Sequence, residues 1–410
     1  MALLALAVSG AAAAALAQRR DAFVESRDHP AVMYSKGATH DPVAALNAQL
    51  ERGATRLAFD ATNGYLAATL EAFKVPRQSQ SLVFSHTSAQ AERISPQNPR
   101  AVYFNDTVAV GWVRGADVLE VAAEDPAQGV IFYTLDQKAT TAPRFKRQDG
   151  CLQCHLSWDT LGVPGLMVLT TFQMTDDPNA YASGFTVDHR SPLEDRWGGW
   201  YVTGTGGTRR HRGNVPVVVK ASQLRKPTDP TPHLDVVDKT FDTRGYLTPY
   251  SDIVALMVLE HQTHMTNLIT RLGWETRVAG RLTPRVQEAV GDLVDYLLFV
   301  DEAPLTGRLQ GTSGFAEYFS ALGPRDSSGR SLRQLDLTNR LMRYPCSYMI
   351  YSPAFEALPA VVKDAVYKRL WEILSGSDTS KPYMRLTAAD RRAVLEILRG
   401  TKTDLPPSFR

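Results

Sequence analysis

The chain has 410 residues, of which 44% are hydrophobic and 21% are charged, and this is enough for a substantial core and more than one domain. Its 45 basic residues nearly balance its 43 acidic residues, so the basic excess typical of nucleic-acid-binding proteins is missing. There are three cysteines, Cys151, Cys154 and Cys346, which are too few for a disulfide scaffold. We therefore expect a globular protein without a nucleic-acid partner.

The first 17 residues are almost all apolar or small. This run is too short to span a bilayer comfortably, and it ends at Ala17 in a small-x-small cleavage pattern. It predicts a signal peptide over residues 1–17, although the usual positive charges at its start are missing. An uncleaved N-terminal anchor is the alternative. We expect a periplasmic or otherwise exported protein that is not an integral membrane protein, because no later stretch is long and apolar enough.

The rest of the chain changes character near its middle. Short helices are expected over residues 41–74, followed by apolar runs that predict strands at 82–84, 101–104, 108–113, 130–133, 166–172 and 215–219. A stretch rich in proline and threonine, residues 226–233, predicts a linker or a long loop. Helical spacing then covers residues 251–272, 283–300, 331–342, 354–374 and 387–398. We predict an α+β fold with a mixed α/β region at 18–245, which contains the close pair of cysteines, and a mainly helical region at 246–410.

The sequence from Cys151 to His155 is Cys-Leu-Gln-Cys-His, which has the spacing of a haem c attachment motif. Two thiols separated by two residues suit the two vinyl groups of one porphyrin, and the imidazole that follows can reach the iron from the same side. The motif predicts one covalent haem c, attached through Cys151 and Cys154, with His155 as the proximal iron ligand. Attachment of this kind takes place outside the cytoplasmic membrane, which agrees with the predicted export.

Two other kinds of site use closely spaced cysteines. A thioredoxin-like dithiol requires a βαβ setting, whereas the residues before Cys151 have the composition of a loop. A zinc site usually needs a second close pair of ligands, and here a fourth ligand would have to be Cys346 or a distant histidine. Both alternatives are weaker than the haem interpretation.

The other axial position of the iron has several candidates. His261 lies near the centre of an apolar helical stripe and is our first choice, although a histidine on such a face is more often a packed core residue. The further candidates are His264, His211, Met257, Met265, Met167 and Met174. A methionine ligand would raise the reduction potential relative to a second histidine, and an open position would suit ligand activation.

A region rich in glycine, tryptophan and arginine spans residues 196–214. Arg209 and Arg210 are candidates to pair with the haem propionates, because arginine binds carboxylates with a two-pronged geometry. A glycine-rich hairpin with a solvated basic tip is the competing interpretation. A later stretch, residues 344–351, combines tyrosines with Cys346 and is expected to be core.

Residues 79–85 and 98–106, together with the motif, resemble a large family of exported bacterial proteins described only as cytochrome c domain proteins. The resemblance covers most of the mature chain and implies a covalent haem on Cys151, Cys154 and His155, but no established reaction. About 130 residues of mature chain precede the motif, unlike in the small carrier cytochromes.

Three functions are compatible with these features. The first is electron transfer to or from a redox partner protein, after loading by the haem c maturation machinery. The second is a haem-dependent oxidoreductase of the peroxidase type, with His211 or an arginine among residues 209–212 acting on the distal side. The third is a haem-based sensor or an assembly subunit.

Overall fold

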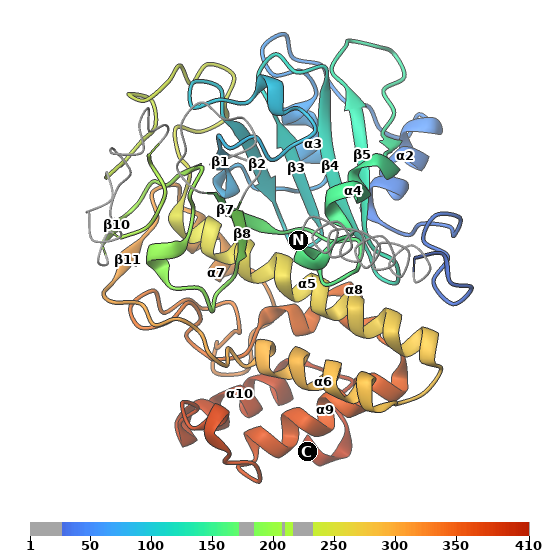
Figure 1. Ribbon diagram of the computed structural model, residues 1–410, viewed down its shortest axis with the longest axis vertical. Helices are drawn as coiled ribbons and strands as arrows, with labels where there is room; N and C mark the ends of the chain where they lie inside the picture. The colour runs from blue at the N-terminus through green and yellow to red at the C-terminus, as the bar shows by residue number, and fades with distance from the viewer. Residues whose placement is uncertain (1–26, 172–183, 207–209, 216–232, 410) are drawn as a thin grey trace, which may run out of the picture.

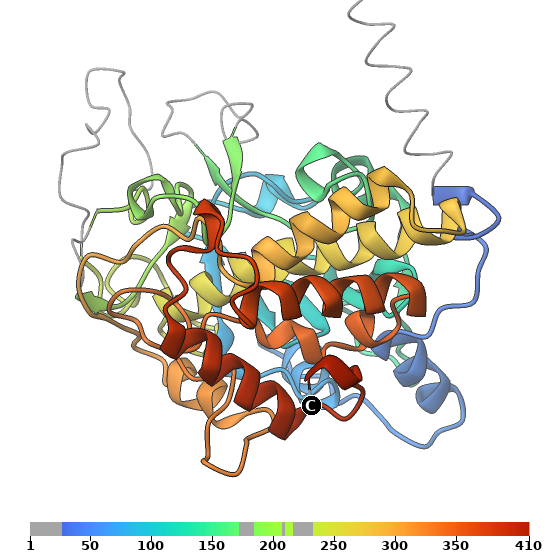
Figure 2. The same ribbon diagram turned by 90° about the horizontal axis from the view of Figure 1, so that it is seen from below.

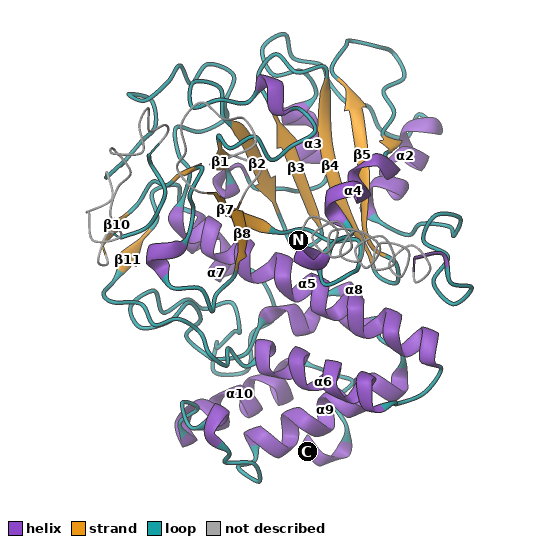
Figure 3. Ribbon diagram, viewed as in Figure 1, coloured by secondary structure: helices purple, strands orange, loops and turns teal. Residues whose placement is uncertain are grey.

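The computed structural model describes residues 27–171, 184–206, 210–215 and 233–409. In this part of the chain the long strands lie in the N-terminal half and the long helices in the C-terminal half (Figure 1, Figure 3). The predicted α+β class is therefore confirmed. The predicted signal peptide, most of the predicted strand at 215–219 and nearly all of the predicted linker lie outside the described residues.

An antiparallel sheet with strand order β6-β5-β4-β3-β2-β1-β9 forms the centre of the N-terminal half. Its strands are β1 (Ser81–Val83), β2 (Arg100–Phe104), β3 (Val108–Trp112), β4 (Val118–Asp125), β5 (Gly129–Asp136), β6 (Lys146–Arg147) and β9 (Trp200–Tyr201). The predicted strands near positions 82, 101, 108 and 130 are all present. Strand β4 was not predicted, because its glutamates and alanines have low strand propensity and its pairing with β3 and β5 supplies the stability.

Two short two-stranded sheets lie outside this sheet. One pairs β7 (Val168–Thr171) with β8 (Gly184–Val187), and β7 falls within the strand predicted at 166–172. The other pairs β10 (Thr205–Gly206) with β11 (Leu309–Gln310) and so joins the two halves of the sequence.

The two faces of the large sheet are covered differently. One face packs under α2 (Pro42–Glu51) and α3 (Leu66–Ala72), where alternate apolar residues of the long strands are buried. The opposite face meets α5 (Ile253–Ala279) at one end of the strands, where the Gln262 side chain donates to the backbone oxygen of Asn105 at 2.7 Å. The middle of this second face remains half-exposed.

Helix α5 lies between the sheet and the remaining helices (Figure 1, Figure 2). Asp252 caps its start by accepting from the backbone N–H groups of Val254 and Ala255, and Gly280 ends it at a φ of 65°. Most of its residues are buried, including the polar residues Glu260, His261 and Asn267, because other elements cover the helix on most sides. Its length and position follow the prediction of a helix from residue 251.

The other C-terminal helices pack around α5 and one another. They are α6 (Pro284–Leu297), α7 (Phe315–Ala321), α8 (Pro353–Glu356), α9 (Ala360–Leu374) and α10 (Ala388–Thr401). Helix α7 also reaches the sheet, where the ring of Phe315 lies 5.6 Å from that of Phe104 on β2. The predicted helix over residues 331–342 is wrong, because this stretch forms turns in which Leu337 adopts a left-handed φ of 59°. Its apolar residues Leu332 and Leu341 are buried by tertiary packing without any helix.

The buried apolar residues form two clusters, one around the sheet with α2 and α3 and one around α5 and the C-terminal helices. The division of the chain at residue 245 stays a prediction, since the helical cluster also contains Val83, Phe104 and Trp197 from the first region. Strand pairing between β10 and β11, together with the packing of Trp274 from α5 in the sheet cluster, links the two. Among the described residues, no helix combines the length and the apolar character needed to cross a membrane.

Candidate functional site: the Cys-x-x-Cys-His turn and the sheet beside it

The motif forms a short helical turn directly after β6. Residues Asp149–Cys151 make a 3-10 turn that continues into α4 (Leu152–His155). The side chain of Leu152 is buried in the sheet cluster and anchors the turn, whereas Cys151 is half-buried and Cys154 is exposed. Because residues three positions apart lie on the same side of a helical turn, the two thiols are presented together.

The imidazole of His155 is held in one orientation. Its Nδ1 lies 2.9 Å from the backbone oxygen of Gly165, and because a carbonyl only accepts, Nδ1 carries the proton. Burial lowers the pKa of His155, while the Gly165 carbonyl works in the opposite direction. The ring packs on Phe132 of β5 with centroids 4.7 Å apart. In the neutral ring this leaves the lone pair on Nε2, the arrangement that histidines bound to metals typically adopt.

The loop that holds His155 is fixed in turn by α5. The side-chain amide of Asn267 donates to the backbone oxygen of Leu166 at 2.8 Å. A Cβ atom at Gly165 would lie 2.0 Å from Asn267 Oδ1, so glycine is required there by the close approach of the helix. The sequence did not point to Asn267 or Gly165, because neither has a motif and their contact spans about a hundred residues.

A row of mostly small residues crosses the sheet next to the motif, in which Val102, Ala109, Glu120 and Ala122 are half-exposed and Gly111 is buried. Strand register places Val102, Gly111 and Glu120 opposite one another, and Ala109 opposite Ala122 in the adjacent row. Ala122 is in turn paired with Phe132, on which the His155 ring packs. We call Val102, Ala109, Gly111, Glu120 and Ala122 the sheet strip. Cofactor sites are mostly apolar with a few placed polar groups, so these residues fit a flat porphyrin bound to the motif.

The three thiols differ in their surroundings. Burial raises the pKa of Cys151, whereas a redox-active dithiol has a lowered one. The sheet that carries the motif is antiparallel and not part of a βαβ unit. Cys346 is buried in the helical cluster, where desolvation raises its pKa to about 12. The described ranges contain no group of three or more His, Cys, Asp or Glu side chains able to share a metal ion such as zinc.

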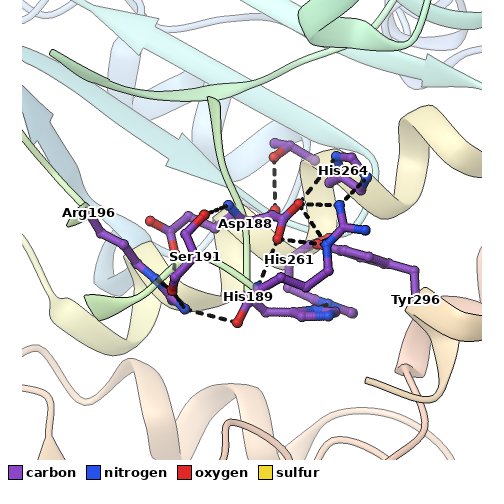
Figure 4. A network of polar contacts seen from close by, with 10 residues as sticks. Asp188, His189, Ser191, Arg196, His261, His264 and Tyr296 are labelled. Carbon is purple, nitrogen blue, oxygen red and sulfur yellow. Dashed lines mark hydrogen bonds and ion pairs between the residues drawn. The ribbon is translucent and has the colours of Figure 1, made fainter. Parts of the chain in front are cut away.

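His261 belongs to a different polar cluster, drawn in Figure 4. It is fully buried on α5. Its Nδ1 atom lies 2.8 Å from Nδ1 of His189, and its Nε2 atom lies 2.7 Å from Oγ of Ser347. Tyr296 and Phe299 stack on the ring, and burial lowers its pKa to about 3. Both ring nitrogens thus have partners. The assignment of His261 to the iron stays a prediction, and it would require one of these hydrogen bonds to break.

The contact between α5 and the motif is made further along the helix. Asn267 lies six residues after His261, which corresponds to about 9 Å along the helix axis. The structure therefore joins His155 to Asn267 and places His261 with His189 and the C-terminal region. His189 was not singled out in the sequence, because its partner is 72 positions away.

The outer end of the His261 cluster contains several charges (Figure 4). Asp188 accepts from Arg190, which also contacts His264, and burial lowers the pKa of His264 to about 4. Deeper in the protein, the Arg196 side chain is 2% exposed and its Nη1 lies 2.9 Å from Oε2 of the fully buried Glu260. Burial raises the pKa of Glu260 to about 7, and the charge of Arg196 opposes that shift.

The remaining predicted residues are spread over the molecule. Arg210 is exposed, and the ring of His211 packs edge-on against Trp197 at 5.2 Å. Met167 is half-buried, while Met257 and Met265 are buried in the helical cluster. Arg209 and Met174 lie outside the described residues. Cys346 and Tyr348 are buried, as predicted for a core segment.

Comparisons with family models, with curated proteins and with solved structures found no match to this chain. The interpretation of the site therefore depends on the motif and on the geometry around it.

Proposed function

We propose that the protein is an exported monohaem c-type redox protein that exchanges electrons with a partner protein. Cys151 and Cys154 carry the thioether bonds and His155 is the proximal iron ligand. The observation that carries the proposal is the hydrogen bond from His155 Nδ1 to the Gly165 carbonyl, which places the proton on Nδ1 and leaves the lone pair on Nε2 for the iron. The same residues without such a bond would fit a structural or redox-inactive turn equally well.

The bound haem supplies a one-electron iron couple, and the chain controls its surroundings. The Gly165 carbonyl fixes the tautomer of His155 and increases the basicity of the ring as a ligand. Phe132 supports one side of the ring, and the small side chains of Ala109 and Ala122 would lie beside a bound haem on the part of the sheet strip that Phe132 adjoins. Cys154 is exposed, so one attachment point lies at the surface, where a partner protein can approach.

Electron transfer is favoured over enzymatic turnover by the position of the residues that a distal site would use. The predicted distal residue His211 packs on Trp197 and lines a small cavity with Gly206 and Ile253, and Arg212 of the same cluster pairs with Asp195 at 2.8 Å. Export and loading by the maturation machinery are part of the proposal, because they are the conditions under which the two thiols would acquire haem.

The first experiment is expression with a signal peptide in a host that has the haem c maturation machinery. We expect a mass increase of one haem that survives denaturation, and a haem c absorption spectrum. Cys151→Ala and Cys154→Ala should each prevent full covalent attachment, while the matched control Cys346→Ala should leave it intact, because Cys346 is buried in the other cluster. A folded wild-type protein without covalent haem would refute the proposal.

Carbon monoxide then separates electron transfer from the other two functions. A reduced spectrum that carbon monoxide leaves unchanged indicates an iron with both axial positions occupied, as electron transfer requires. A strong shift would indicate an open position and would favour the peroxidase-like oxidoreductase or the haem-based sensor.

A further inference from the structure

Arg100 is a charged residue placed directly beside the sheet strip. It occupies the first position of β2, and its side chain reaches across to Glu120 on β4, where Nη2 and Oε2 are 2.6 Å apart. Glu120 also accepts from the hydroxyl of Ser88 at 3.1 Å. Both members of the pair are partly exposed, at 24% for Arg100 and 18% for Glu120, so a ligand on the strip can reach them.

The sheet makes room for this guanidinium by omitting a side chain. A Cβ atom at Gly111 would lie between 2.4 and 2.8 Å from three atoms of the Arg100 guanidinium group. The backbone φ of Gly111 is not positive, so its conformation does not require glycine. A glycine inside a strand weakens the strand and often marks a close approach. Here the approaching group is the guanidinium, which lies over Gly111 in the middle of the strip.

The guanidinium retains unused hydrogen-bonding capacity. Its Nε–H is buried and makes no hydrogen bond within the described part of the chain, although guanidinium groups normally use their donors when buried. The strand register relates the pair to the motif. Glu120 lies two residues before Ala122 on β4, on the same face of the sheet, and Ala122 is paired with Phe132, on which the His155 ring packs at 4.7 Å.

We propose that Arg100 binds a carboxylate of the haem, with Glu120 as its partner when that carboxylate is absent. The proposal depends on the haem c function above. Haem carries two propionates, and the fork of an arginine binds a carboxylate through two donors. This assignment differs from the sequence-based candidates Arg209 and Arg210, and it makes β2 and β4 part of the haem site.

The test uses the haem-loaded protein and its one-electron midpoint potential. Removing a cation from a haem carboxylate leaves negative charge near the iron and favours the ferric state. Arg100→Gln should shift the ferric–ferrous equilibrium about tenfold toward ferric, a fall of about 59 mV for one electron. Arg100→Lys keeps the charge and should restore most of the potential. The matched control is Arg93→Gln, because Arg93 pairs with Asp117 at the surface and is 49% exposed.

A pH profile separates binding of the carboxylate from a general charge effect. Arg100, Glu120 and the hydroxyl of Ser88 are the polar groups that face the proposed carboxylate, so Glu120 must be removed as a source of titration. We compare Glu120→Gln with the double variant Arg100→Gln/Glu120→Gln. A carboxylate that loses its arginine has a raised pKa, so the potential of the double variant should become pH-dependent between about pH 4 and 7.

The outcomes distinguish the two proposals. A wild-type protein without covalent haem refutes the proposed function. Two results would show that the assignment of Arg100 is wrong while the haem function stands. The first is attached haem with the same midpoint potential in Arg100→Gln as in Arg93→Gln. The second is the same pH dependence of the potential in the double variant as in Glu120→Gln. A purely structural role for Arg100 would lower the melting temperature without producing the new pH dependence.

Discussion

Replacing Glu260 by alanine removes the carboxylate that the buried guanidinium of Arg196 contacts at 2.9 Å. Removing one partner of a buried ion pair typically costs about 3–5 kcal/mol, because the remaining charge has lost its compensation in a poorly polarisable interior. Arg196 keeps its hydrogen bonds to the backbone oxygens of His189 and Ser191, so we expect a loss of about 3 kcal/mol, at the lower end of this range. With an unfolding entropy of about 2.1 cal/mol/K per residue, this lowers the melting temperature by roughly 3–4 °C if the chain unfolds in one step.

The assay is urea unfolding followed by far-ultraviolet circular dichroism, in which a lower midpoint at constant slope reports a loss of stability. The double variant Arg196→Met/Glu260→Leu removes both buried charges and should recover most of the loss. The control is Glu51→Ala, because Glu51 is 50% exposed and its pair with Arg144 lies at the surface. The reasoning fails if Glu260→Ala costs no more than Glu51→Ala, or if the double variant is as unstable as the single one.

Three further predictions concern other parts of the structure. His261 is neutral in the folded protein, whereas in the unfolded chain it takes up a proton near pH 6.5. The free energy of unfolding should therefore fall by about 1.4 kcal/mol per pH unit from this group as the pH drops from 6.5 to 4. In His261→Gln the number of protons taken up on unfolding, measured from the pH dependence of urea midpoints, should fall by about one, and an unchanged number would contradict the assignment. Gly165→Ala should lower the melting temperature measured by differential scanning calorimetry, because the added methyl group meets Asn267 and loosens the His155 loop. Adding Asn267→Ala should recover part of that loss of stability. If it does not, the contact between these two residues is not the cause. In protein made without haem, a thiol reagent should modify Cys154 quickly and Cys346 only after denaturation, and rapid labelling of Cys346 in the native state would contradict its burial.

Local patterns in the sequence were sufficient for the motif and for most of the elements. The motif occupies five consecutive residues, and one helical turn is enough to present its two thiols together. Helix α5 was predictable because its apolar character persists over many turns, and α6 because Thr283 stands before a proline as an N-cap. Where local preference and tertiary packing disagreed, as in β4 and in the stretch 331–342, the prediction failed.

The sequence by itself determined the α+β class, the candidate haem attachment residues and the candidate proximal ligand, because these depend on residues close together in the chain. Only the tertiary structure decided what surrounds them. The carbonyl that orients His155 comes from a loop that α5 fixes through Asn267, and the sheet strip with Arg100 forms only when three strands come into register. His261, which the sequence ranked first for the iron, contacts His189 and Ser347 in a separate buried cluster, and its assignment to the iron stays a prediction. Such contacts join residues tens to hundreds of positions apart, and a single sequence contains no local pattern that identifies them.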